Sequence, residues 1–327
     1  MAGVEKSKVI LRAVDSATLA PAIRECMQLC EWEQFVAPDA KVVIKPNLCT
    51  AIPDKWEMSN TDPAIAEAVC NVLLTRTKRI FIGESDGLRQ TAWDSFRVSG
   101  YVEAAKRLGV ELVNFTESPW TKVKCEPVGE IALPSLMLEA DVFVTLPTLK
   151  THALTYFTGA LKNQWGCLPE YDRILLHKAL DPLLATLQRI FHPQLTVMDG
   201  IVCMEGRGPT NGKPRRLDVI LASRDALALD ATAMRLVGLE PTRARHLVLA
   251  AEQGLGRIRK EEIEVDGDWE RHATQFEPAM LDKAVAAMNY MSRYRWFVKY
   301  ALETDYVFFP VRTLVQLLRR IGVVEGA

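Results

Sequence analysis

Short apolar runs rich in β-branched residues alternate with amphipathic segments through residues 1–240 of the chain. The apolar runs predict strands at residues 41–46, 79–85, 110–115, 140–147, 195–200 and 217–223. The amphipathic segments repeat apolar residues at helical spacing and predict helices at residues 61–76, 100–109, 181–191 and 225–238. Continuous apolar strands separated by helices are typical of a parallel sheet that is buried on both faces. We therefore predict an α/β fold with a doubly wound, mostly parallel sheet and helices on both faces.

The sequence changes in character from about residue 275, where helical, aromatic-rich segments replace the alternation. This region ends with a basic face that contains Arg312, Arg319 and Arg320. We assign residues 1–270 to the α/β core and residues 271–327 to a helical C-terminal extension. The amphipathic pattern favours packing of the extension on the core or on a second subunit, and we expect a homo-oligomer. Peripheral contact of these helices with a membrane surface, or with another partner, is the alternative.

The composition is that of an ordinary globular protein, since 49% of the 327 residues are hydrophobic and 25% are charged. The net charge of −1 provides no basic field for binding nucleic acid. No apolar run approaches the ~18 residues of a membrane span, and the start, MAGVEKSK, lacks the apolar core of a signal peptide. We therefore expect a cytoplasmic protein without a transmembrane span or a nucleic acid partner.

The seven cysteines are spread along the chain and form no CxxC motif. This spacing is typical of free thiols in a reducing compartment. It also argues against an iron–sulfur cluster held by this chain alone.

Polar residues follow most of the predicted strands at the point where the strand ends. Lys45 and Asn47 lie at the end of the strand at 41–46, Glu84 lies at the end of the strand at 79–85, and Asp199 lies at the end of the strand at 195–200. In open parallel sheets, ligands bind just beyond the carboxyl ends of the strands. The coincidence of these positions therefore predicts a binding or active site at this edge of the sheet.

The segment LPTLKTHALTYFTGALKNQWG, residues 146–166, is the most polar of these strand ends. Lys150 and His152 are two residues apart in an extended stretch and therefore share a face. Lys162 lies ten residues beyond His152, and His177 lies fifteen beyond Lys162. Histidines that titrate near neutrality and desolvated lysines can donate and accept protons, so we predict His152, Lys162 and His177 as catalytic residues. The residues predicted to bind a carboxylate or phosphate are Lys45, Asn47, Lys150, Thr158, Asn163 and Arg207.

A second polar segment, DGIVCMEGRGPTNGKPRR at residues 199–216, is rich in glycine and proline. This composition predicts a long loop after a strand, and long loops in compact domains are often binding loops. The candidate ligands for a divalent metal are Glu84, His152, Asp199 and Glu205. Neither a GxxxxGK[ST] loop nor a GxGxxG motif after the first strand is present, so nucleotide binding of the common kinds is poorly supported.

Several blocks of the sequence together resemble the domain-of-unknown-function 362 family over residues 40–260. The matching blocks are VVIKPNL, TDPAIAEAV, IGES, ADVFVTLPTLKTHALTYFTGALKNQWG, HPQLTVMDGIVCMEGRGP and LASRDALALDATAMRLVGL. This family name carries no settled activity. Many of its members append ferredoxin-like cysteines, which this chain lacks.

The order His152, Lys162, His177 around a glycine-containing turn is also distantly similar to the active-site segment of the lactate racemase family. In that family a lysine tethers a nickel-pincer nucleotide, and histidines act as acid and base. The resemblance implies two α/β lobes with a cleft between them. It also implies that Lys162 anchors or contacts a cofactor, while His152 and His177 transfer protons or bind a metal.

Taken together, these features predict an intracellular enzyme that acts on a small anionic carbon acid by Lys/His proton transfer, as an isomerase, epimerase or lyase. The cofactor is left open between a divalent metal, a metal-containing nucleotide and none. One alternative is a metal- or flavin-dependent oxidoreductase that is fed by an external electron carrier. The other is a non-catalytic binding or scaffold protein that uses the aromatic C-terminal helices.

Overall fold

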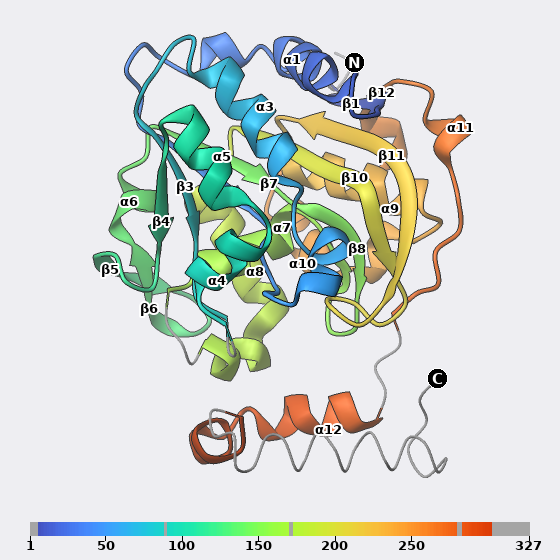
Figure 1. Cartoon of the computed structure of the whole chain (residues 1–327). Coiled ribbons are helices and arrows are strands. Elements are labelled where there is room, and N and C mark those ends of the chain that lie inside the picture. The colour runs from blue at the N-terminus through green and yellow to red at the C-terminus, as the bar shows by residue number, and fades with distance from the viewer. Residues whose placement is uncertain (1–5, 88–89, 170–172, 280–282, 303–327) are drawn as a thin grey trace.

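The computed structural model describes residues 6–87, 90–169, 173–279 and 283–302, and within them it contains one large mixed sheet (Figure 1). The ten strands of this sheet in the described residues are β1 Ser7–Ala13, β2 Val42–Pro46, β3 Ile80–Glu84, β4 Glu111–Asn114, β7 Val142–Leu146, β8 Thr148–His152, β9 Tyr156–Thr158, β10 Leu195–Glu205, β11 Lys213–Ser223 and β12 Ile263–Asp266. A separate hairpin is formed by β5 Trp120–Cys125 and β6 Gly129–Pro134.

The strand order along the sheet is β12-β1-β11-β10-β7-β2-β3-β4. The run from β10 to β4 is parallel throughout, and β11 is antiparallel to both of its neighbours. The chain turns at Pro147, so that β8 replaces β7 as the neighbour of β10, and β9 pairs antiparallel with β8. The prediction of a mostly parallel α/β sheet is confirmed.

Helices cover both faces of the sheet, as predicted (Figure 1). The described helices are α1 Leu19–Leu29, α2 Trp56–Ser59, α3 Pro63–Leu73, α4 Ala92–Val98, α5 Tyr101–Leu108, α6 Ser135–Leu138, α7 Ala160–Asn163, α8 Leu180–Phe191, α9 Ala226–Leu236, α10 Arg245–Glu252, α11 Trp269–His272, α12 Lys283–Met291 and α13 Arg295–Phe297. One hydrophobic core joins α1, α3 and α4 to Val42 and Ile44 of β2. Two further cores lie on the opposite face, one under α9 and α10 and the other under α8.

Capping side chains determine where two of these helices begin. Asp62 accepts a hydrogen bond from the Ala64 amide and is followed by Pro63, whose fixed φ suits the first helical position of α3. Asp225 accepts hydrogen bonds from the Leu227 and Ala228 amides at the start of α9. The helices predicted at residues 61–76 and 225–238 are therefore confirmed, and these caps fix their first turns.

The prediction of a long loop at residues 199–216 is wrong. Strands β10 and β11 form a long antiparallel hairpin, and only residues 206–212 connect them. Gly200 lies inside β10, where a side chain would clash with the Val219 carbonyl oxygen at 2.8 Å. The glycine at this position reflects close strand packing, which composition alone does not distinguish from a loop.

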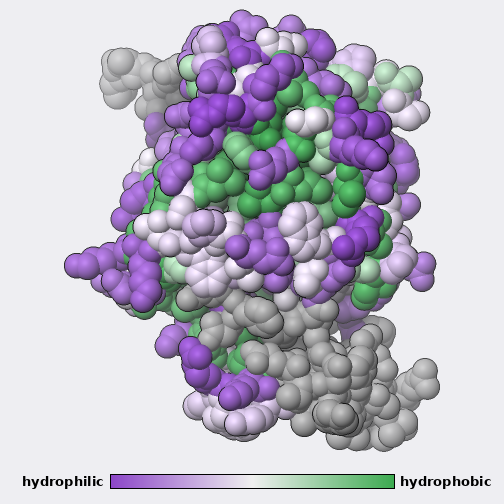
Figure 2. Space-filling view, turned by 60° about the vertical axis from the view of Figure 1, so that its left-hand side comes forward, coloured by the Kyte–Doolittle hydropathy of each residue, from purple (hydrophilic) through white to green (hydrophobic). Residues whose placement is uncertain are grey.

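The C-terminal part of the described chain is helical, with α12 and α13 followed by a short π-helix at Val298–Leu302. The predicted basic face of Arg312, Arg319 and Arg320 lies outside the described residues. None of the helices in the described part of the chain is both long and apolar enough to cross a bilayer. Figure 2 shows the face on the left-hand side of Figure 1, where a hydrophobic area is framed by hydrophilic side chains.

Candidate active site

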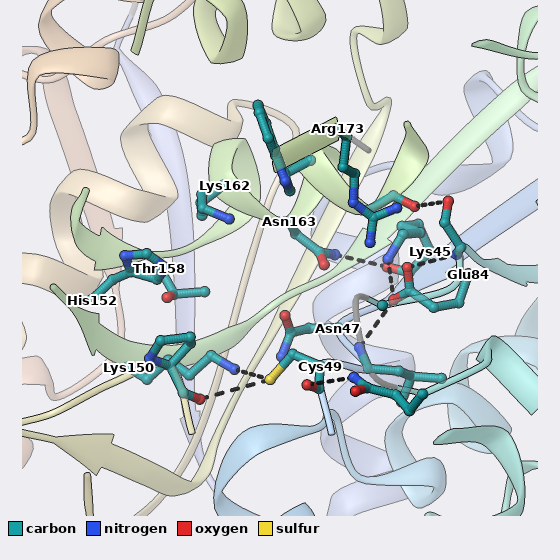
Figure 3. Close-up of a pocket in the computed structure, with 17 residues that line it drawn as sticks. Lys45, Asn47, Cys49, Glu84, Lys150, His152, Thr158, Lys162, Asn163 and Arg173 are labelled. Carbon is teal, nitrogen blue, oxygen red and sulfur yellow. Dashed lines mark hydrogen bonds and ion pairs between the residues drawn. The ribbon is translucent and has the colours of Figure 1, made fainter. Parts of the chain in front are cut away.

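A cavity of about 290 Å³ opens at the carboxyl ends of the parallel strands, where the strand-end pattern predicted a site. Its lining includes eight of the residues predicted for the site, namely Lys45, Asn47, Glu84, Lys150, His152, Thr158, Lys162 and Asn163 (Figure 3). These side chains come from β2, β3, β8, β9 and α7, apart from Asn47, which directly follows β2, and they surround a common space.

A buried ion pair forms one wall of the cavity. Lys45 Nζ lies 2.5 Å from Glu84 Oε2, and it also donates a hydrogen bond to the carbonyl oxygen of Pro46. The other acceptor positions of Glu84 receive the amides of Leu48 and Ser85. Gly166 faces this pair, and a β-carbon there would lie 2.5 Å from Glu84 Oε1. The charge of Lys45 is therefore compensated inside the protein, and the glycine makes room for the pair.

Two asparagines tie the neighbouring strands together beneath the cavity. Asn163 donates hydrogen bonds to the Lys45 carbonyl oxygen and to Thr145 Oγ1. Asn47 donates to the Ser59 carbonyl oxygen at 2.6 Å. These amides, which were predicted to bind substrate, are engaged with the protein and hold the strand ends in position.

The ribbon formed by β8 and β9 presents polar groups on a single face. Lys150 and Thr158 are directly opposite each other in the ladder, and His152 follows two residues after Lys150. Lys150 Nζ donates to the Ser59 carbonyl oxygen at 2.6 Å and lies 3.1 Å from Cys49 Sγ. Thr158 Oγ1 is buried and has no hydrogen-bond partner among the described residues. A buried hydroxyl without a partner is costly, so this group is a candidate ligand contact.

The hydrogen bonds of His152 determine its tautomer. Its Nδ1 atom accepts the backbone amides of Leu154 and Thr155, at 3.1 and 3.2 Å. Burial, followed by the positive charges of Lys162 and Lys150, lowers the pKa of His152 well below its usual value. A neutral imidazole whose Nδ1 accepts must carry its proton on Nε2. His152 therefore offers the cavity an N–H donor, which argues against the predicted roles of base and metal ligand.

Lys162 is the candidate proton acceptor. Burial, followed by the positive charges of Arg173 and Lys150, lowers its pKa from 10.5 to about 7. Among the described residues no carboxylate pairs with it, and its Nζ lies 5.6 Å from the centre of the Trp165 ring. An amine with this pKa is partly unprotonated near pH 7 and can take up a proton.

A buried carboxylate that the sequence did not reveal positions Lys162. Asp230 of α9 accepts the amides of Ala160 and Leu161 at the start of α7, at 2.7 and 3.2 Å. Gly159 precedes these amides, and any β-carbon on it would clash with the Asp230 carboxylate. Burial raises the pKa of Asp230 to about 7. In the sequence, Asp230 lies within an apolar helical pattern, and nothing there distinguishes it from the other residues of that helix.

Two further cavity residues were also missed. Arg173, in a 3₁₀ segment at Arg173–Ala179, donates to the Leu168 carbonyl oxygen at 2.5 Å, and burial lowers its pKa. Cys49 donates to the Ser59 carbonyl oxygen at 3.3 Å and lies beside Lys150. Both residues lie in irregular segments, so no periodicity indicated where their side chains would point.

His177 does not line the cavity, although it was predicted to be catalytic. Its ring packs against Trp165, with 5.2 Å between the ring centres. Burial lowers the pKa of His177 to about 4, so the imidazole is neutral near pH 7. The Trp165 ring, which lines the cavity, also lies 5.6 Å from Lys162 Nζ, and the charge of Lys162 adds to the effect of burial on the pKa of His177.

The other predicted residues outside the cavity lining have structural partners or lie in the hairpin turn. Asp199 is buried, accepts the amides of Asp62 and Ile201, and has a pKa raised by burial to about 7. Glu205 pairs with Arg215 at 3.0 Å. Arg207 lies in the turn between β10 and β11.

The four predicted metal ligands are not brought together, because Asp199 and Glu205 lie outside the cavity that Glu84 and His152 line. In the described part of the chain, no group of three or more His, Cys, Asp or Glu side chains is arranged to hold a metal ion. Together with the Nδ1 bonds of His152, this arrangement does not fit a divalent metal ion held through these four side chains.

The sequence profile of a domain of unknown function, DUF362, matches residues 42–235. The chain belongs to the DUF362 family. The match spans β2 to α9, which includes every strand end that contributes to the cavity. The resemblance seen in the sequence is therefore confirmed.

The chain is also similar to a curated protein, the thylakoid-associated protein sll1697 of Synechocystis sp. The two are 28% identical over 261 residues, which cover 77% of this chain and 80% of that protein. Two solved structures are more distant. A protein from Thermotoga maritima has 14% identity and a TM-score of 0.38, with 71% of this chain and 59% of that chain covered. The lactate racemase apoprotein from Thermoanaerobacterium thermosaccharolyticum has 11% identity and a TM-score of 0.42, with 68% and 55% covered. The match spans less than two thirds of either solved chain.

Proposed function

We propose that this protein is an enzyme that moves a proton to and from carbon in a small anionic substrate, as an isomerase, epimerase or lyase. The observation that carries the proposal is Lys162, an amine with a pKa of about 7 in a cavity that also contains Lys150 and Arg173. The two neighbouring cations both attract an anion and keep Lys162 from holding its own proton.

In the proposed step, the neutral Lys162 amine takes the proton from the carbon next to a carboxylate. The electron pair of the broken C–H bond moves into the carboxylate to form an enediolate. His152 Nε2–H donates to the oxygen on which this charge develops, and Lys150 lies on the same face of the β8–β9 ribbon. Return of the proton to the carbon, or loss of a group from the neighbouring carbon, completes the reaction.

A neutral imidazole is well suited to this donor role. A protonated His152 would add another positive charge beside Lys150 and Lys162, and both of these charges already lower its pKa. The backbone amides on Nδ1 keep the Nε2–H tautomer in place without a change of charge.

Exchange of deuterium from solvent tests the proposal directly. Small hydroxy and oxo acids, including lactate, malate, glycolate and 2-phosphoglycolate, are incubated with the protein in D₂O, and loss of the carbon-bound proton is followed by ¹H NMR. We expect exchange with at least one acid, and loss of that exchange by at least about 10²-fold in Lys162→Met, the usual contribution of a general base.

The matched control is Lys122→Met, because Lys122 is an exposed lysine on β5 and does not line the cavity. This variant should exchange protons at the rate of the unaltered protein. Equal exchange in Lys162→Met and in the control would overturn the assignment of Lys162 as the base.

We also propose peripheral contact with a membrane surface by the C-terminal helices. Four aromatic side chains there are exposed by 44–59%, namely Tyr290, Tyr294, Trp296 and Tyr300. The basic residues Arg293, Arg295 and Lys299 alternate with them, and aromatic and basic side chains together suit an anionic lipid interface. The name of the Synechocystis relative, a thylakoid-associated protein, is in line with this proposal.

Cosedimentation with vesicles tests the membrane proposal. We expect binding to phosphatidylglycerol vesicles, weaker binding to phosphatidylcholine vesicles, and loss of binding in a Tyr294→Ser, Trp296→Ser double variant. Equal sedimentation of the double variant and the unaltered protein would contradict it. Trp120, an exposed tryptophan on β5, provides the control variant Trp120→Ser.

A further inference from the structure

The cavity contains two cations that form no direct ion pair within the described part of the chain. Neither Lys150 nor Arg173 has a carboxylate within ion-pair distance there, and each donates to a backbone carbonyl oxygen. Burial lowers the pKa of Arg173, and the more distant charges of Glu84 and Asp86 offset only part of this shift. Lys45 differs, because Glu84 lies 2.5 Å from its ammonium group. Buried or half-buried cations without counterions are costly, so the site is built to receive negative charge.

In the view of Figure 3, Lys150 and Lys162 lie on one side of the cavity, and Arg173 lies on the other side, beside Lys45 and Glu84. Lys150 belongs to the β8–β9 ribbon, whereas Arg173 comes from the 3₁₀ segment that precedes α8. A substrate whose reacting carbon faces Lys162 would therefore meet Lys150 at one end and could extend a second anionic group toward Arg173. The separation therefore indicates two anion subsites.

The first subsite is built on one face of the β8–β9 ribbon. Lys150 and Thr158 are partners in the ladder, and His152 shares their face. The ammonium group, the partnerless Thr158 hydroxyl, which is 3% exposed, and the His152 Nε2–H are three donors of different kinds aimed at the cavity. Such a set matches the oxygens of a carboxylate whose charge changes during proton transfer.

The second subsite is the Arg173 guanidinium. One of its nitrogens is anchored to the Leu168 carbonyl oxygen, which leaves further N–H groups for a ligand. Guanidinium groups bind carboxylate and phosphate through paired N–H donors. Arg173 is thus placed to bind an anionic group remote from the reacting carbon.

We propose that the site takes a dianionic substrate: a carboxylate at the β8–β9 ribbon and a second carboxylate or a phosphate at Arg173. This inference rests on the proposed proton transfer for the position of the reacting carbon. It adds the charge of the substrate and assigns Arg173 as the residue that selects for the remote anion.

Calorimetric titration with matched pairs of acids tests this proposal without any turnover. Malate is compared with lactate, and 2-phosphoglycolate with glycolate, because each pair differs in the second anionic group. We expect at least one dianion to bind about tenfold or more tightly than its monoanionic partner, the ratio typical of one charge-assisted pair. Preference for malate identifies a carboxylate at Arg173, and preference for 2-phosphoglycolate identifies a phosphate.

Two variants separate the subsites. Arg173→Met should abolish the preference for the dianion, so that both members of a pair bind with similar affinity. Thr158→Val should weaken both members of a pair equally and should not lower the unfolding midpoint, since the hydroxyl has no partner to lose. Three results would overturn the proposal. Arg173→Met could still prefer the dianion, or the unaltered protein could bind both members of each pair with equal affinity. The third is that the unaltered protein binds none of the four acids at 10 mM. The titrations are repeated on Lys162→Met. If this variant still prefers the dianion while the unaltered protein exchanges no carbon-bound proton, the proposed proton transfer is overturned and the dianion proposal stands.

Discussion

Replacing Lys162 by Met should stabilise the protein at neutral pH, although it removes the proposed base. The pKa of Lys162 falls from 10.5 to about 7 on folding, mainly because the ammonium group is buried. Between these two values the unfolded chain holds a proton on this lysine that the folded protein has released. The folded state therefore gains stability from this residue as the pH rises from about 7 to 10.5, and below about 7 it carries the full cost of the buried charge.

The magnitude follows from the pKa difference of about 3.5 units (10.5 minus about 7). Each unit corresponds to about 1.36 kcal/mol, so the cost of Lys162 is about 4 kcal/mol at pH 7, about 2 kcal/mol at pH 9 and near zero above pH 10.5. Methionine has a similar length and carries no charge. Loss of the contact between Lys162 and Trp165 offsets about 1 kcal/mol of the gain.

Urea denaturation from pH 6.5 to 9.5 measures this effect as the difference between Lys162→Met and the unaltered protein. The other titrating groups contribute equally to both proteins and cancel in the difference. We expect a positive difference in unfolding free energy that shrinks steadily with increasing pH, and no such trend for Lys122→Met. A difference that does not change with pH, or that grows with pH, would refute the depressed pKa of Lys162.

Three further substitutions test the walls of the cavity. Glu84→Gln leaves Lys45 buried without a counterion and should lower the free energy of unfolding by about 3 kcal/mol, as measured by urea denaturation; a change below 1 kcal/mol would show that the pair is not buried. Gly166→Ala places a β-carbon 2.5 Å from Glu84 Oε1 and should cost about 2 kcal/mol in the same assay, whereas an unchanged midpoint would contradict the close approach. His177→Phe keeps a ring against Trp165 and should leave deuterium exchange within about threefold, while a loss above tenfold would restore the catalytic role predicted from the sequence.

The mostly parallel sheet and the strand-end position of the candidate site followed from local patterns in the sequence. Lys45 and Glu84 were predicted to lie at one edge of the sheet because parallel strands end there, and the structure shows that they form an ion pair at that edge. Lys150 and His152 were predicted to share a face, and the β8–β9 ladder places them so. The spacing within one strand was enough to predict the shared face of Lys150 and His152. The common direction of neighbouring strands was enough to predict the shared edge of Lys45 and Glu84.

The features that were missed depend on contacts that no local pattern encodes. The tautomer of His152 is determined by two backbone amides that reach its Nδ1 only when the chain turns after β8. Asp230 is distinguished from other helix residues only by the amides of α7, about 70 residues away in sequence. Arg173 lies in a 3₁₀ segment without an amphipathic pattern. The glycine and proline of the β10–β11 hairpin resembled a loop because close strand packing and turns select the same residues.

The ionisation of Lys162 within the anion cavity is the central claim, and NMR can measure it at a single atom. The protein is labelled with ¹³C at lysine Cε, the Lys162 signal is assigned by its absence in Lys162→Met, and its chemical shift is followed with pH. We predict a midpoint near pH 7, the value to which burial and the positive charges of Arg173 and Lys150 lower the pKa. A midpoint near 10.5, the ordinary value for lysine, would contradict the account.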